Sequence, residues 1–281
     1  MDSFVFAAVL FAAAAHAGWN AAIKTGLEPL TTTVLIAIGA GVVALPFLPF
    51  VGLPPSRAWP WVIASVIIHL AYFAGLIEAY RTGDMGQVYP IARGTAPLLT
   101  AITATTWLGE RLGLVGWTGL ICLVSGVFLL SLRGGRDLAK LNRHAVGFAL
   151  FTAVTICAYS IVDGVGARIA GSANAYSVAL FIGNAIIMAF YALVRRGPTV
   201  FGDMSTQWIK GLVGGGLQLG SYWIAIWAMT VAPIAIVAAL RETSVLFGAL
   251  IAVVILKEPL RATRVLAAAM IVAGLVMIRL H

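Results

Sequence analysis

Ten apolar stretches, each long enough to cross a bilayer as a helix, constrain this chain more than any other feature. A transmembrane helix needs about 20 mostly apolar residues. Windows of that kind lie near residues 3–23, 31–52, 59–80, 86–108, 113–132, 145–166, 175–194, 210–230, 233–256 and 262–280. Only 10% of the residues are charged and 61% are hydrophobic, against about 25% charged residues in a soluble domain. We therefore predict an all-α membrane protein with ten transmembrane helices.

The longest polar stretch, RGGRDLAKLNRH at residues 133–144, lies almost at the middle of the chain. It separates five apolar windows from five others. We therefore predict a first five-helix repeat at residues 1–132, a linker at 133–144 and a second five-helix repeat at 145–281.

An internal repeat supports this division. Residues 92–112 (ARGTAPLLTAITATTWLGERL) align without gaps to residues 240–260 (LRETSVLFGALIAVVILKEPL), which pairs Arg93 with Arg241 and Glu110 with Glu258. An odd number of spans per half places the second half in the membrane with opposite orientation. Such inverted repeats are typical of carriers that work by alternating access around a central site. The sequence thus predicts two inverted five-helix repeats around a central cavity.

Several longer motifs resemble the EamA family of the drug/metabolite transporter superfamily. They are HAGWNAAIK, VYPIARGTAPLL, TWLGERLGLVGWTG, LRETSVLFGAL and VILKEPLRATRV. The resemblance implies a cavity lined by spans 1, 3, 4, 6, 8 and 9, with spans 5 and 10 at the periphery. It also implies export of small metabolites across the bacterial inner membrane, with aromatic and neutral amino acids as the leading substrates.

The resemblance and the charge pattern disagree on orientation. Most basic residues fall in the loops after the odd-numbered spans, and the positive-inside rule then places both termini outside the cytoplasm. Members of the family commonly keep both termini in the cytoplasm. These loop positions explain the formal charge of +8 through lipid headgroups rather than nucleic acid. We expect a monomer in the lipid bilayer that binds a small molecule and no nucleic acid.

Two arginines are the clearest candidates for chemistry, because a charge at membrane depth costs about 2.5–3.5 kcal/mol. Arg93 and Arg241 each lie about two turns into a span. One of them could bind a substrate carboxylate in a bidentate manner. The alternative is a structural role, with pairing to Glu242 or Asp163.

Aromatic and amide side chains complete the candidate site. His69, Tyr72 and Phe73 share one helical face at i, i+3 and i+4. Rings with a polar edge suit a cavity that must hold an apolar side chain and still offer hydrogen bonds, although packing is the alternative for each. The predicted substrate-binding residues are Trp19, Asn20, His69, Tyr72, Phe73, Tyr89, Arg93, Tyr159, Gln218, Tyr222, Trp223 and Arg241.

Other functions receive less support from the residues. The chain has no DxxD or DxxxD pattern and no Walker A motif, so we expect neither an enzyme nor a cofactor or metal ion. A scaffold without transport and a membrane-embedded lipid-modifying enzyme are weaker alternatives. A multidrug or cation exporter of the same superfamily is the main alternative, although the first span contains no Asp or Glu within its apolar run.

Overall fold

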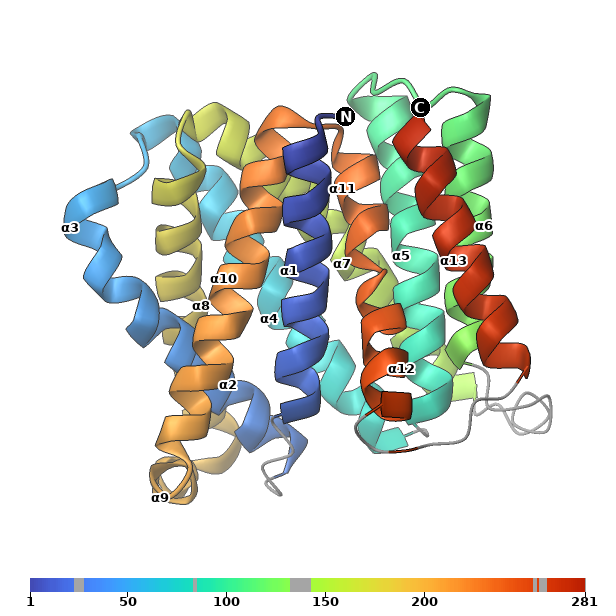
Figure 1. Ribbon diagram of the computed structural model, residues 1–281. Coiled ribbons are helices and arrows are strands. Elements are labelled where there is room, and N and C mark those ends of the chain that lie inside the picture. The colour runs from blue at the N-terminus through green and yellow to red at the C-terminus, as the bar shows by residue number, and fades with distance from the viewer. Residues whose placement is uncertain (23–27, 83–84, 132–142, 255–256, 258–261, 281) are drawn as a thin grey trace.

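The computed structural model describes residues 1–22, 28–82, 85–131, 143–254, 257 and 262–280. Their regular structure is helical throughout, because lipid offers backbone N–H and C=O groups no partners and a helix satisfies them internally. The helices are α1 (Ser3–Ala22), α2 (Pro29–Ala44), α3 (Leu48–Val51), α4 (Trp59–Thr82), α5 (Met85–Trp107), α6 (Leu114–Ser131), α7 (Arg143–Ala170), α8 (Ala173–Arg196), α9 (Thr199–Ser205), α10 (Trp208–Val231), α11 (Ile234–Arg241), α12 (Ser244–Val254) and α13 (Ala262–Leu280). Figure 1 shows most of them running side by side, with both chain ends at the same end of the bundle.

Each predicted window corresponds to helix, but two windows are interrupted. The second is broken after Ala44, where Pro46 and Pro49 begin a 3-10 turn (Leu45–Phe47) and then α3. The ninth is broken at Glu242 and Thr243, between α11 and α12. The fourth window carries Pro90 and Pro97, yet α5 runs through it as one helix. Of the two matching segments that carry Arg93 and Arg241, only the second is therefore interrupted.

Six of these helical segments are long and apolar enough to cross a membrane, counted over the described residues. Two shorter apolar helices, Ser3–Gly18 and Leu114–Leu130, accompany them. The helices α5 and α10 are less apolar because they carry polar side chains, Arg93 and Gln218 among them. Large apolar side chains such as Phe4 and Ile186 point outward and are 71% and 67% exposed. An outer surface of this kind suits lipid rather than water.

Small residues allow the closest helix contacts. In α6 and α13, a Cβ added at Gly274 would lie 2.6 Å from the carbonyl oxygen of Gly119, and one added at Gly126 would lie 2.8 Å from that of Ala267. In α2 and α10, a Cβ at Gly215 would lie 2.2 Å from the amide nitrogen of Ala40. Gly215 thus allows α10 to approach α2 closely, whereas a Cβ added at Gly220 would have no neighbour within 4 Å.

Candidate functional site

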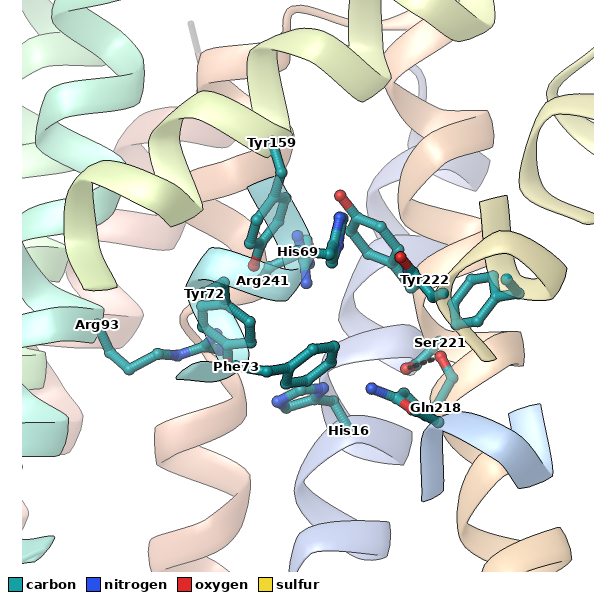
Figure 2. A pocket seen from close by; sticks show the side chains of 13 residues that line it. His16, His69, Tyr72, Phe73, Arg93, Tyr159, Gln218, Ser221, Tyr222 and Arg241 are labelled. Carbon is teal, nitrogen blue, oxygen red and sulfur yellow. Dashed lines mark hydrogen bonds between the residues drawn. The ribbon is translucent and has the colours of Figure 1, made fainter. Parts of the chain in front are cut away.

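A cavity of about 50 Å³ lies inside the bundle. Its walls come from α1, α2, α4, α5, α7, α8, α10 and α11, so that residues far apart in the sequence meet there (Figure 2). The lining residues are His16, Ala37, His69, Tyr72, Phe73, Arg93, Tyr159, Phe181, Asn184, Gln218, Ser221, Tyr222 and Arg241. Eight of the twelve candidates from the sequence are in this set. All six helices expected to line a cavity contribute to it, and α2 and α8 join them.

The remaining candidates are placed elsewhere or not described. Trp223 lies away from the cavity: its ring packs edge-to-face on Phe47 at 5.4 Å, and its Nε1 donates to Asn174 Oδ1 at 2.8 Å. Grouping it with Tyr222 in one cavity was wrong, because neighbouring residues on a helix point about 100° apart. The side chains of Trp19, Asn20 and Tyr89 lie outside the described residues.

Aromatic rings form one wall of the cavity. The His69 imidazole stacks on Tyr159 with ring centroids 4.3 Å apart and an interplanar angle of 23°. Tyr222 meets both rings edge-on, at 5.8 Å from each. Tyr72 adds a further edge-on contact with Tyr159 at 5.6 Å. The face predicted at His69, Tyr72 and Phe73 is confirmed as a cavity-lining face, and its rings provide apolar contact with polar edges.

The two arginines have different partners. Arg93 Nε lies 2.9 Å from Glu242 Oε2, and its Nη2 donates to Ser244 Oγ at 3.1 Å. Both members of this ion pair are buried, so the charge of Arg93 is compensated within the protein. Arg241 instead lies over the Tyr222 ring, with its Cζ 4.5 Å from the centroid. No acidic side chain in the described part of the chain forms an ion pair with Arg241.

A buried carboxylate holds the ring on which Arg241 rests. Asp163 has no exposed surface and accepts hydrogen bonds from Tyr222 Oη at 2.5 Å and from Tyr176 Oη at 2.9 Å. The sequence suggested Asp163 as a possible ion-pair partner of either arginine. Its actual role is to fix the Tyr222 ring, and through that cation–π contact it fixes the position of the guanidinium of Arg241.

The His69 imidazole is also fixed by its own helix. Its Nδ1 lies 3.0 Å from the carbonyl oxygen of Ser65, one turn earlier, and 3.1 Å from Ser65 Oγ. A carbonyl only accepts, so Nδ1 carries the hydrogen in the tautomer that satisfies this contact. Within the described residues, no group of three His, Cys, Asp or Glu side chains could hold a metal ion.

A second polar cluster fixes the start of the helix that carries Arg241. Glu110, in the loop between α5 and α6, accepts from the amide of Ile234 at 2.7 Å and from that of Ala235 at 3.1 Å. Arg168 at the end of α7 lies 3.3 Å from Glu110 and also donates to Met229 O at 2.8 Å. Glu110 thus caps the N-terminus of α11. Its repeat partner, Glu258, lies outside the described residues.

The sequence reasoning missed several lining residues, of which Asn184 is the most polar. The resemblance left α8 out of the cavity wall, so an amide within the apolar segment FIGNAIIM received no weight. Its position in the middle of a span was the available signal, because an amide there requires a hydrogen-bond partner. His16 and Ser221 also line the cavity and were not among the predicted substrate-binding residues.

Comparison with known proteins identifies the family. The model of the EamA-like transporter family matches residues 2–132 and again residues 144–280. The chain belongs to the EamA-like transporter family. It is therefore a multi-pass membrane protein of a transporter family, whose members act on small molecules within a lipid environment.

Individual relatives match over shorter stretches. An uncharacterised transporter of Sinorhizobium sp. is 29% identical over 77 residues, and the multidrug resistance protein EbrB of Bacillus subtilis (strain 168) is 35% identical over 77 residues. These alignments span 27% of this chain and 54% and 64% of the two relatives. One crystal structure shares the EamA-type fold with a TM-score of 0.80, at 17% identity, over 99% of this chain and 96% of the other.

Proposed function

We propose that this protein is a secondary transporter that exports small metabolites across the bacterial inner membrane by alternating access. Amino acids with aromatic or neutral side chains are the proposed substrates. One observation carries this proposal: Arg241, which has no ion pair among the described residues, brings its guanidinium to an aromatic cavity inside the bundle. A guanidinium there binds a substrate carboxylate, and the surrounding rings accept an apolar side chain.

Contacts between α6 and α13 support the inverted repeat that alternating access requires. Cys122 Sγ donates to Met270 O at 3.3 Å, and these two residues are 148 positions apart. Gly119 packs on Gly274, and Gly126 packs on Ala267. At the same spacing Gly119 corresponds to Ala267 and Gly126 to Gly274, so each of these two contacts is the image of the other. That exchange is expected of two halves related by a pseudo-two-fold axis.

The size of the cavity fits a carrier in which the site changes shape during transport. A cavity of about 50 Å³ holds a few water molecules, whereas sites for small ligands enclose about 300–1,000 Å³. A substrate such as phenylalanine therefore requires the helices to separate. We propose that this conformation is a contracted one, and that movement of α11 and α12 around their break at Glu242 and Thr243 contributes to expansion.

A multidrug or cation exporter is the second candidate, because one relative is named a multidrug resistance protein. The charges of the cavity favour the first. Among its described lining residues are two arginines and two histidines and no acidic side chain. The nearby carboxylates already have partners, Glu242 with Arg93 and Asp163 with two tyrosines. A lipophilic cation would find no acidic partner among the described lining residues and would lie close to Arg241.

Counterflow in proteoliposomes tests the proposal. Purified protein is reconstituted with unlabelled substrate inside, and uptake of labelled amino acids and of a labelled lipophilic cation is compared with that of empty liposomes. We expect uptake of phenylalanine and related neutral amino acids, and none of the cation. Absence of uptake across a broad amino-acid panel would refute the proposal, and uptake of the cation alone would favour the second candidate.

The role of Arg241 is tested in the same assay. Arg241→Gln removes a charge-assisted interaction, so we expect a loss of transport efficiency of about tenfold to a hundredfold, with part of it retained in Arg241→Lys. Arg195→Gln is the matched control, since Arg195 is 48% exposed and pairs with Glu78 away from the cavity. Equal efficiencies for Arg241→Gln and the control would contradict this role.

A further inference from the structure

Two amides in the cavity wall have carbonyl oxygens without hydrogen-bond partners among the described residues. They belong to Asn184 on α8, which is 5% exposed, and Gln218 on α10. Ser221 lies next to them in the wall and donates its hydroxyl hydrogen to the backbone carbonyl of Gln218 at 3.0 Å. A buried amide without a partner is destabilising, so these groups require a ligand or water in the functional cycle.

Three other polar groups of the cavity already have partners. Arg93 is paired with Glu242, Tyr222 donates to Asp163, and His69 binds its own helix at Ser65. The side-chain oxygens of Asn184 and Gln218 differ from these three groups, because they have no hydrogen-bond partner among the described residues. Figure 2 shows Gln218 and Ser221 next to each other on one side of the cavity, with Arg93 on the opposite side.

We propose that Asn184 and Gln218 form a subsite for the ammonium group of the substrate, while Arg241 binds its carboxylate. This inference rests on the proposed function and narrows it to zwitterionic α-amino acids. An ammonium group has three N–H donors and no acceptor, so it pairs with amide oxygens. The NH₂ and C=O ends of an amide are interchangeable by rotation about its last bond, so either side chain can turn its oxygen toward the ligand.

Charge balance supports a zwitterion over a simple amine or a simple acid. A monocation would bring its charge to a wall that already contains Arg241 and offers only neutral acceptors. A monoanion would satisfy Arg241 and leave both amide oxygens without donors. A zwitterion satisfies the guanidinium and the amides together, and the stacked pair of His69 and Tyr159 remains for its side chain.

Paired substrates isolate the ammonium subsite. Efflux of labelled phenylalanine and of labelled 3-phenylpropanoate, which lacks only the amino group, is measured from proteoliposomes. The wild type is expected to move phenylalanine at least tenfold more efficiently. Asn184→Leu and Gln218→Met nearly preserve volume and remove the acceptor, so each is expected to lower phenylalanine efflux about tenfold to a hundredfold and to leave 3-phenylpropanoate efflux equal or higher.

The control lies on the same helix. Asn174→Leu removes an exposed amide that binds Trp223 outside the cavity, and it is expected to change neither rate. If Asn184→Leu does not fold, Asn184→Asp provides a second test of the subsite. Its added negative charge is expected to allow transport of phenethylamine, which has no carboxylate. The wild type is expected to exclude phenethylamine.

The outcomes separate the two proposals. If the wild type moves neither compound nor any other amino acid of the panel, the proposed function fails. If it moves both equally well, the carrier stands and the ammonium subsite is refuted. A parallel loss of both substrates in Asn184→Leu and Gln218→Met, or no entry of phenethylamine in Asn184→Asp, would likewise overturn the subsite.

Discussion

Glu110 holds the helix that carries the cavity arginine, and its replacement offers a quantitative test. Its two carboxylate oxygens accept from the first two amides of α11 at 2.7 and 3.1 Å, and α11 ends at Arg241. Loss of a helix cap costs about 0.5–2 kcal/mol. Loss of a negative charge at a helix N-terminus costs about 0.3–1 kcal/mol, and up to about 2 when partly buried.

The ion pair with Arg168 adds little. That guanidinium is 37% exposed, and exposed pairs contribute about 0–1 kcal/mol. Arg168 also keeps its bonds to Met229 O and Ala232 O when the acid is removed. We therefore expect Glu110→Ala to lower the free energy of unfolding by about 1–4 kcal/mol. Glu110→Gln retains one acceptor oxygen and should cost about half as much.

Denaturation by SDS in mixed micelles, followed by tryptophan fluorescence, measures this difference. Glu78→Ala is the matched control, because Glu78 pairs with Arg195 at 3.1 Å and both side chains are partly exposed; its cost should be at most about 1 kcal/mol. Transport by Glu110→Ala should also fall, because Arg241 loses its fixed support. A cost within about 0.5 kcal/mol of that of the control would show that the cap contributes no stability and would refute this reasoning.

Two further tests concern buried contacts between helices. Arg93→Gln leaves Glu242 as a buried carboxylate without its cation and should lower the free energy of unfolding by about 3–5 kcal/mol. The double variant Arg93→Met with Glu242→Leu should recover most of this stability. Thermal unfolding in detergent measures both, and an additive loss in the double variant would contradict the pairing. Gly274→Ala places a Cβ 2.6 Å from a backbone oxygen of α6 and should cost about 1–3 kcal/mol. Gly220→Ala meets nothing within 4 Å and should be neutral or stabilising in the same melt; equal changes for the two glycines would count against the close contact.

The helical segments were predictable because lipid permits few alternatives. A stretch of about 20 apolar residues in a bilayer must satisfy its backbone internally, so every predicted window is helical in the structure. The interruptions were harder to predict. Pro46 and Pro49 indicate the first interruption, because proline removes a helical hydrogen bond. The second, at Glu242 and Thr243, depends on tertiary partners: Glu242 reaches across to Arg93 at 2.9 Å, which local pattern cannot reveal.

The candidate site was predictable where helical periodicity decided it. His69, Tyr72 and Phe73 share a face, and all three line the cavity. Depth in the membrane alone was not sufficient, as Trp223 demonstrates: it lies at the same depth as Tyr222 and faces Phe47 and Asn174 instead. Asn184 and Gln218 are both polar amides within apolar spans, yet only Gln218 was among the predicted residues. Which face of a helix meets the cavity is set by packing between helices, which one sequence does not encode locally.

The two arginines have different partners because only one of the two matching segments carries an acidic residue next to its arginine. The segments match at Arg93 and Arg241, yet glycine follows the first arginine and Glu242 follows the second. Glu242 can form a close ion pair with only one of the two arginines. Adjacent positions on a helix diverge by about 100°, so Glu242 points away from its own neighbour and pairs across the bundle with Arg93. Arg241 is therefore left to the Tyr222 ring and to the cavity. The two matching arginines thus differ in their contacts: Arg93 is held in a buried ion pair, and Arg241 lies against a ring in the cavity wall.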